Sequence, residues 1–287
     1  MKSVPRLAKE PQELAAYRAA NPTDAAASGA EAGAAWNRFR DDPCYKTLRA
    51  ELVTAQQGLC AYCEQRLTTD KGVLHANDQQ IEHVLPKSGA ASRTLDWTNF
   101  MLCCGGGTFR TNDPTYADPI RHYRGEENVS CGQKKDDREL PADCDPRNFP
   151  CVPGLVSVSI DGTLAVNAAA CSAAGVAASS LSETINVLLN LNCDRLKLPR
   201  SKVADNILKW VVPMLKALLD ETHLTTEQRQ AFHWLLISGR LQKDTVGHLR
   251  PFWTTERTFL EPDASTWITQ NTNSCGCPAQ AATQSAP

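Results

Sequence analysis

The feature that most constrains this chain is a central stretch, residues 59–150, that is dense in Cys, His, Gly and Pro and lacks hydrophobic periodicity. Such a stretch cannot bury enough apolar surface to be held together by packing alone. The chain has 12 cysteines in 287 residues, and its N-terminus lacks the apolar region of a signal peptide. No apolar run approaches the ~20 residues that a membrane span requires. We therefore expect a cytoplasmic protein without membrane contact, in which cysteines serve as metal ligands or small core residues rather than as a disulfide framework.

Cys60 and Cys63 form a C-x2-C pair, a spacing that lets two thiolates bind one metal ion. Redox pairs share this spacing, but the βαβ context typical of them is absent. A tetrahedral site needs two further ligands, and the nearest candidates downstream are Cys103, Cys104 and Cys131. Chemistry alone does not choose between Cys103 and Cys104, because adjacent cysteines rarely both bind one ion. The pattern predicts a structural zinc site that holds the stretch folded.

Regular secondary structure is predicted on both sides of this stretch. Leu48 and Leu52 fall at helical spacing ahead of a stop at Gly58. Residues 156–167 alternate around an Asp-Gly turn, which is typical of a β-hairpin. From about residue 181 to 260 apolar residues recur at helical spacing, and the sequence from Thr225 to Gln228 matches a capping box.

These patterns predict an α+β fold, in which a zinc-stapled module lies between a helical lead-in and a mainly helical C-terminal region with a β-hairpin. We divide the chain into four parts: a flexible Ala/Pro-rich arm (1–35), the cysteine module (36–150), the hairpin with the helical region (151–266), and a disordered tail (267–287).

Glu82 and His83 are consecutive in the segment IEHVLPKS, which lies between the cysteine pairs in the sequence. A neutral histidine can deprotonate water, and a carboxylate on the other face of the strand can hold a divalent cation. Asn99, in the segment DWTNF, could fix the histidine or its loop. Taken alone, a Glu-His pair is common, and an ordinary surface histidine is the favoured interpretation.

The combination changes that interpretation. C-x2-C, then E-H-x-x-P-K, then D-W-x-N-F with a following cysteine, then C-x-x-x-K resembles the HNH endonucleases in order and spacing. The resemblance implies a ββα-metal (His-Me finger) core and hydrolysis of nucleic-acid phosphodiesters with one catalytic ion, Mg²⁺ or Mn²⁺. It implies that His83 is the general base, Glu82 a metal ligand and Asn99 a loop-fixing residue.

The same resemblance assigns the structural zinc and a lysine. The family's zinc cysteines fall on Cys60, Cys63, Cys104 and Cys131, and Cys104 is preferred over Cys103 because the usual gap after the asparagine is five residues. Lys135 matches the family lysine four residues after the last cysteine, where it either contacts phosphate or only solvates its helix.

The chain departs from the family at one catalytic position. HNH proteins usually carry His or Asn directly after the last zinc cysteine, and this chain has Gly132. Gln133, Asp136 and Asp137 are the candidates to replace that ligand; alternatively, the ion has fewer protein ligands and more water. We expect Glu82 and Gln133 to bind the catalytic ion.

Longer segments resemble a narrower group of HNH proteins, encoded beside retrons and Septu-type antiphage systems together with an ABC/SMC-like ATPase. These segments include QQGLCAYCEQRL, CGQKKDD and ETINVLLNLNCDRLKLPR, within residues 36–210. The resemblance implies a nuclease effector of phage defence that is held or triggered by the ATPase, with DNA favoured over RNA as substrate.

The charge distribution argues against a nuclease that acts alone. The net charge is −2, and residues 82–138 hold eight basic and eight acidic side chains, so the module lacks the basic footprint of a tight DNA binder. Residues 195–257 hold eleven basic and six acidic side chains, which suits a phosphate backbone, an acidic partner or a solvated helix face. Two rivals remain: a zinc-binding docking subunit with a decayed nuclease site, favoured by Gly132, and a thiol-redox protein that uses Cys60 and Cys63.

Overall fold

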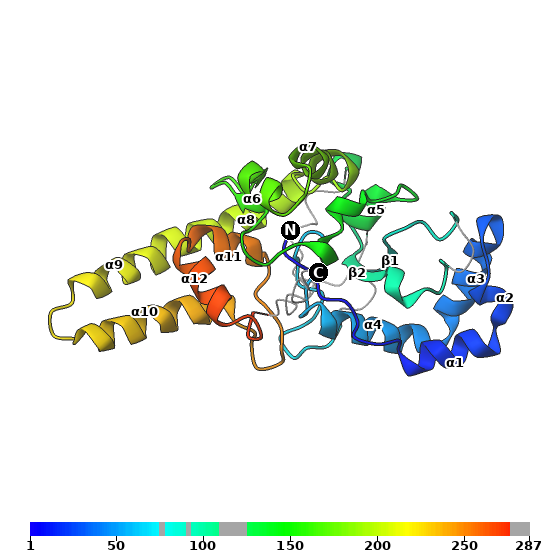
Figure 1. The fold of residues 1–287 in the computed structure, drawn as a ribbon, viewed down its shortest axis with the longest axis horizontal. Helices are drawn as coiled ribbons and strands as arrows, with labels where there is room; N and C mark the ends of the chain where they lie inside the picture. The colour runs from blue at the N-terminus through cyan, green and yellow to red at the C-terminus, as the bar shows by residue number, and fades with distance from the viewer. Residues whose placement is uncertain (75–77, 90–92, 109–124, 276–287) are drawn as a thin grey trace, which may run out of the picture.

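The structure is a computed structural model that describes residues 1–74, 78–89, 93–108 and 125–275 (Figure 1). It is a mixed α+β fold, as predicted, in which two small antiparallel sheets of two strands each are surrounded by helices. Within the described ranges, no helix combines the length and the apolar character that crossing a membrane requires. Residues 276–287 of the predicted disordered tail lie outside the described residues, whereas residues 267–270 are helical and Trp267 and Ile268 are buried.

The N-terminal part is a group of four helices at one end of the molecule (Figure 1). They are α1 (Gln12–Ala20), α2 (Pro22–Ala25), α3 (Gly29–Asp41) and α4 (Pro43–Ala55). The segment expected to be a flexible arm therefore contains helices. The physical reason is that alanine has the highest helix propensity, and its small side chain lets helices pack closely; Ala32 and Ala35 are fully buried beside Phe39.

The helix predicted before Gly58 is α4. The Asp42 side chain caps its N-terminus by accepting a hydrogen bond of 2.9 Å from the backbone N–H of Cys44. Gly58 follows the helix with φ +79°, and its N–H donates to the carbonyl of Val53. A side chain at this position would also collide with His248, whose Cγ lies 2.6 Å from the position of a Cβ. Both observations require glycine here.

The cysteine module contains one hairpin-like strand pair and a short helix. β1 (Gln79–His83) pairs with β2 (Phe100–Cys104), with Glu82 opposite Met101 and Gln79 opposite Cys104. Helix α5 (Cys131–Lys135) packs against β2. This ββα arrangement lies between the N-terminal helices and the rest of the chain (Figure 1).

The predicted hairpin and the predicted C-terminal helices are both present. The hairpin consists of β3 (Val156–Val158) and β4 (Leu164–Val166). The helices are α6 (Ala168–Ala173), α7 (Ala178–Glu183), α8 (Asp194–Asn206), α9 (Val212–Asp220), α10 (Thr226–Leu241), α11 (Trp253–Phe259) and α12 (Asp263–Gln270). The capping box from Thr225 to Gln228 opens α10 as predicted. Helices α9 and α10 project from the body as an antiparallel pair (Figure 1).

Two buried clusters form the core. The first joins residues from Met1 to Leu196, so the N-terminal helices, the cysteine module, the hairpin and α8 share one core across the expected boundary at residue 150. The second cluster joins Leu59 to side chains of the C-terminal helices, among them Trp253 and Trp267. The cysteine module is therefore wrapped by both flanking regions, and these regions also contribute to the site.

Candidate metal centre and active site

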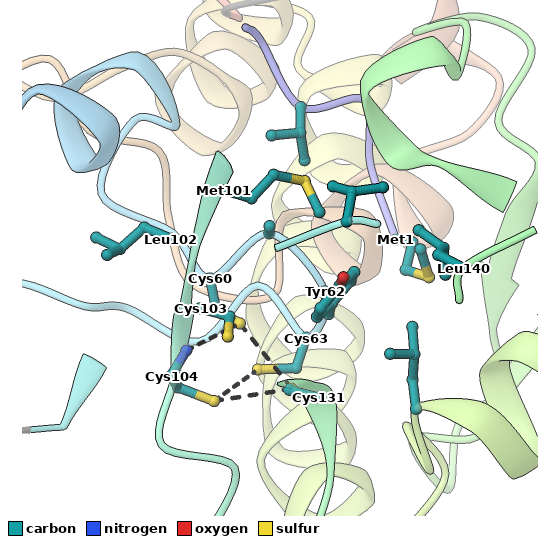
Figure 2. Close-up of a cluster of buried hydrophobic side chains, with 14 of the residues drawn as sticks. Met1, Cys60, Tyr62, Cys63, Met101, Leu102, Cys103, Cys104, Cys131 and Leu140 are labelled. Atoms are coloured by element: carbon teal, nitrogen blue, oxygen red, sulfur yellow. Dashed lines mark hydrogen bonds between the residues drawn. The ribbon is translucent and has the colours of Figure 1, made fainter. Parts of the chain in front are cut away.

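Four cysteine sulfur atoms converge where separate segments meet (Figure 2). Cys60 and Cys63 lie in the turn after α4, Cys104 ends β2, and Cys131 begins α5. All four Sγ atoms lie within 4.8 Å of one another. The separations include 3.7 Å between Cys63 and Cys104 and 4.0 Å between Cys60 and Cys131. Zinc–sulfur bonds of about 2.3 Å in a tetrahedron place the sulfurs about 3.8 Å apart, so this set could hold zinc without rearrangement.

The structure places Cys104, rather than its neighbour Cys103, in this group. Successive side chains of a strand point to opposite faces. The Sγ of Cys104 lies 3.7 Å from that of Cys131, and the backbone N–H of Cys104 donates to the Sγ of Cys60 at 3.3 Å. Cys103 instead lies near α5, with its Sγ 2.9 Å from where a Cβ at residue 132 would be.

Without a metal ion, the pKa values of the four thiols differ. Hydrogen bonding with Cys131, Cys60 and Cys63 holds the pKa of Cys104 well below its usual value. Burial raises the pKa of Cys63 and of Cys131 well above theirs. Zinc binding requires thiolates, so the metal must displace protons from the raised-pKa members of the group.

A buried arginine that sequence reasoning did not single out lies beside the cysteines. Arg195, near the start of α8, is only 2% exposed. Its guanidinium donates to Ser130 Oγ, to the carbonyl of Asn128 and to Gln65 Oε1. Burial alone would lower the pKa of Arg195, but the nearby thiolates, led by Cys104, raise it above its usual value. Four thiolates on Zn²⁺ carry a net charge of −2, and the single positive charge of Arg195 offsets half of it.

Glu82 is buried and accepts two polar contacts on one carboxylate oxygen. Its Oε1 lies 3.1 Å from Nζ of Lys135 and 3.3 Å from the hydroxyl of Tyr62. Burial raises the pKa of Glu82, and the Lys135 ammonium and the Tyr62 hydroxyl oppose that rise. Tyr62 lies between the two cysteines of the C-x2-C pair, so one turn carries both zinc ligands and a contact to the acidic residue.

His83 ends β1 and lies in an aromatic cage. Its ring makes edge contacts with Trp36 at 4.5 Å and with Phe100 at 5.1 Å between centroids. Nε2 lies 3.0 Å from the carbonyl oxygen of Thr94. A carbonyl only accepts, so Nε2 carries the proton and Nδ1 carries the lone pair. Burial lowers the pKa of His83 to about 4, and the ring is therefore neutral at pH 7.

Asn99 ties together the loop that follows β1. Its amide group both accepts from the N–H of Leu85 and donates to the carbonyl of Leu85, each at 2.8 Å. It also donates to the carbonyl of Arg93 at 3.4 Å. These bonds hold both ends of the loop that carries Thr94, and hence the partner of His83.

Helix α5 brings the remaining predicted residues to the same place. Lys135 is 1% exposed, and besides the ion pair with Glu82 it donates to the carbonyls of Asp136 and Arg138 at 3.2 and 3.0 Å. Lys135 is thus a buried partner of the acidic residue. Gln133 donates to Gln80 Oε1 of β1.

A cleft of about 600 Å³ opens over these groups. Glu82, His83, Gly132, Gln133 and Lys135 line it. Asp136 and Asp137, the other candidates to replace the ligand that Gly132 lacks, line it as well. The structure therefore gathers the predicted non-cysteine residues around one cleft, except Asn99, which supports its loop.

The described residues around Glu82 offer few protein ligands for a divalent ion. In the described part of the chain, the four cysteines form the one group of three or more His, Cys, Asp or Glu side chains close enough to share an ion. Oε2 of Glu82 accepts no hydrogen bond from described residues, and it faces the space that Gly132 leaves without a Cβ. Mg²⁺ commonly keeps several waters and takes one or two carboxylates, which is compatible with this arrangement.

Comparison with known proteins agrees with the motifs. No family model matches the chain. A protein of Escherichia coli described as "Retron Ec83 putative HNH endonuclease" is 26% identical over 227 residues, which cover 71% of this chain and 79% of that protein. The chain is thus a distant relative of a protein named as an HNH endonuclease of a retron, and this similarity supports the HNH resemblance of its cysteine and acid–histidine motifs.

Proposed function

We propose that this protein is a metal-dependent HNH endonuclease that hydrolyses phosphodiester bonds of nucleic acid, with DNA as the favoured substrate. One observation carries the proposal: a neutral histidine, whose Nδ1 has no partner among the described residues, adjoins a buried carboxylate in an open cleft beside a four-cysteine group. The order of β1, β2 and α5 around these residues supports a ββα-metal core. The named relative supports the same activity.

His83 has the properties of a general base. Its Nε2–H is held by Thr94, which fixes the ring and directs basicity to Nδ1. Nδ1 has no hydrogen-bond partner among the residues described, so it is available to a water molecule. The lowered pKa keeps the ring unprotonated at pH 7. Nδ1 takes a proton from the water that attacks phosphorus, the bond from phosphorus to the leaving oxygen breaks, and the leaving oxygen takes a proton from solvent.

Glu82 and Lys135 set the charge of the site. A bound divalent ion would neutralise negative charge on the phosphate and on the leaving oxygen, and Glu82 and Gln133 would hold that ion. Lys135 keeps the Glu82 carboxylate ionised and oriented by their ion pair. Tyr62 donates to the same oxygen, which directs Oε2 toward Gly132.

The test is cleavage of plasmid DNA by purified protein with Mg²⁺ or Mn²⁺, in parallel with the variant His83→Ala. We expect loss of cleavage with unchanged zinc content and unchanged melting behaviour. His223→Ala, which alters an exposed histidine before α10, is the matched control and should cut normally. Cleavage that persists in His83→Ala would show that another group is the base.

We further propose that the nuclease is an effector of bacterial antiphage defence that acts with an ABC/SMC-like ATPase, as the narrower resemblance implies. The retron relative supports this context. The competing function is a zinc-binding docking subunit without catalysis, favoured by Gly132. Adding a candidate ATPase to the cleavage assay separates the two, because a docking subunit stays inactive in every combination and an effector gains activity.

A further inference from the structure

Part of the cleft wall comes from helices that precede the ββα unit. Helix α3 contributes Trp36 and Arg40, and helix α4 contributes Tyr45 and Arg49. Trp36 touches the ring of His83 directly. The segment before the ββα unit is therefore part of the cleft that contains the acid–histidine pair.

Two arginines on this wall lack the partners that arginines in folded proteins usually have. Arg40 is exposed, and neither Arg40 nor Arg49 makes an ion pair or a hydrogen bond with any described residue. The Nε of Arg49 is buried and unpaired. The Arg49 guanidinium is held over the ring of Tyr45, with Cζ 5.0 Å from the ring centroid. A buried donor without an acceptor is unfavourable, and a ligand with acceptor oxygens would relieve that cost.

The charges of the cleft indicate an anion on this wall. The lining holds four basic side chains (Arg40, Arg49, Lys87 and Lys135) and three acidic ones (Glu82, Asp136 and Asp137). Lys135 is paired with Glu82, whereas Arg40 and Arg49 make no ion pair with a described residue. Guanidinium groups match the geometry of phosphate oxygens.

We propose that Arg49 and Arg40 form a subsite for a backbone phosphate of nucleic acid next to the scissile one, with the Arg49 guanidinium as its anchor. The inference rests on the proposed endonuclease function and adds to it the residues that place the strand. Tyr45 stiffens Arg49 before the ligand arrives, so less side-chain entropy is lost on binding. Arg40, which is exposed, contributes charge and steering.

The test measures binding separately from cleavage. In the His83→Ala background, the affinity for a short fluorescein-labelled DNA duplex is measured by anisotropy at several KCl concentrations. Arg49→Gln should weaken binding roughly tenfold, and the slope of log affinity against log salt should fall by about one. Arg49→Lys keeps the charge but loses the planar guanidinium group, so its affinity should lie between those of the parent and Arg49→Gln. Lys46→Gln removes an exposed charge from the same helix outside the cleft lining and should bind like the parent.

The outcomes distinguish this subsite from the nuclease proposal. Equal losses of DNA affinity in Lys46→Gln and Arg49→Gln, or no loss in either variant, would overturn the subsite. This holds even if His83→Ala abolishes cleavage. Absence of duplex binding by the parent would overturn it as well. Arginine-dependent binding by a protein that never cuts DNA would support the subsite and overturn the nuclease. Arg40→Gln provides a second variant at an exposed position, with an expected loss smaller than that of Arg49→Gln and no effect on folding.

Discussion

A Cβ atom on residue 132 would lie 2.3 Å from Oε2 of Glu82, so Gly132 and the acidic side chain occupy one shared space. The same Cβ would lie 2.9 Å from Cys103 Sγ and from Gln80 Nε2. Contacts under 3.0 Å force something to move, and two of the three neighbours, Glu82 and Cys103, are buried. Gly132, which departs from the HNH pattern, therefore leaves room for the side chain of Glu82.

Gly132→Ala should displace the Glu82 carboxylate and reduce cleavage on the order of a hundredfold, because a misplacement near 1 Å has that effect on catalysis. Stability should fall by about 1–3 kcal/mol through overpacking. Plasmid cleavage and thermal unfolding measure the two effects. Gly239→Ala, in α10 with open space around its Cβ position, is the control and should not lower stability. Normal cleavage by Gly132→Ala would mean that the position of Oε2 is unimportant.

Cys104→Ala and Cys103→Ala should differ sharply, although they alter adjacent buried residues. The first removes a member of the four-sulfur group, so we expect loss of bound zinc and of several kcal/mol of stability. The second removes a sulfur outside the group and should retain one zinc ion. Elemental analysis with thermal unfolding distinguishes them. Equal zinc content in the two variants would contradict the assignment of Cys104 as a ligand.

Arg195→Met should weaken zinc retention, because it removes the buried cation beside the four cysteines and the donor to Ser130 Oγ and to the carbonyl of Asn128. Losing the donor of a buried acceptor costs about 1–3 kcal/mol. Arg195→Lys should recover part of this. Zinc affinity is measured by competition with a chromogenic chelator. Lys202→Met, an exposed change in the same helix, should match the parent; a loss as large in Lys202→Met would refute a specific role for Arg195.

The buried His83 should make stability depend on pH below neutrality. Its pKa is about 4 in the folded chain and about 6.5 in the unfolded chain, so the unfolded chain binds more protons between these values. The stabilisation is fully present above pH 6.5 and is lost as pH falls toward 4, by about 3 kcal/mol in total. Urea unfolding of the parent and of His83→Gln across this range isolates the contribution. Parallel pH profiles for the two proteins would exclude a buried neutral histidine.

Local patterns predicted much of the fold. The helix before Gly58, the hairpin around the Asp-Gly turn, and the capping box at Thr225 depend on neighbours within a few residues, and all three are present. The N-terminal segment differs because alanine-rich composition suits either a loose arm or a tightly packed helix. Packing of Ala32 and Ala35 in the core, which involves distant residues, selects the helix.

The sequence by itself predicted the C-x2-C metal-binding pair and the acid–histidine pair Glu82-His83. Both predictions depend on ligand spacing and strand alternation, which involve residues close together in the chain. The tertiary structure decided which cysteine of an adjacent pair meets the other three, since that depends on which face of β2 meets the C-x2-C turn and Cys131. It also decided that Lys135 pairs with Glu82, that Arg195 lies beside the four cysteines, and that helices α3 and α4 line the cleft. These contacts join residues tens of positions apart, and only the packing of the whole core brings them together.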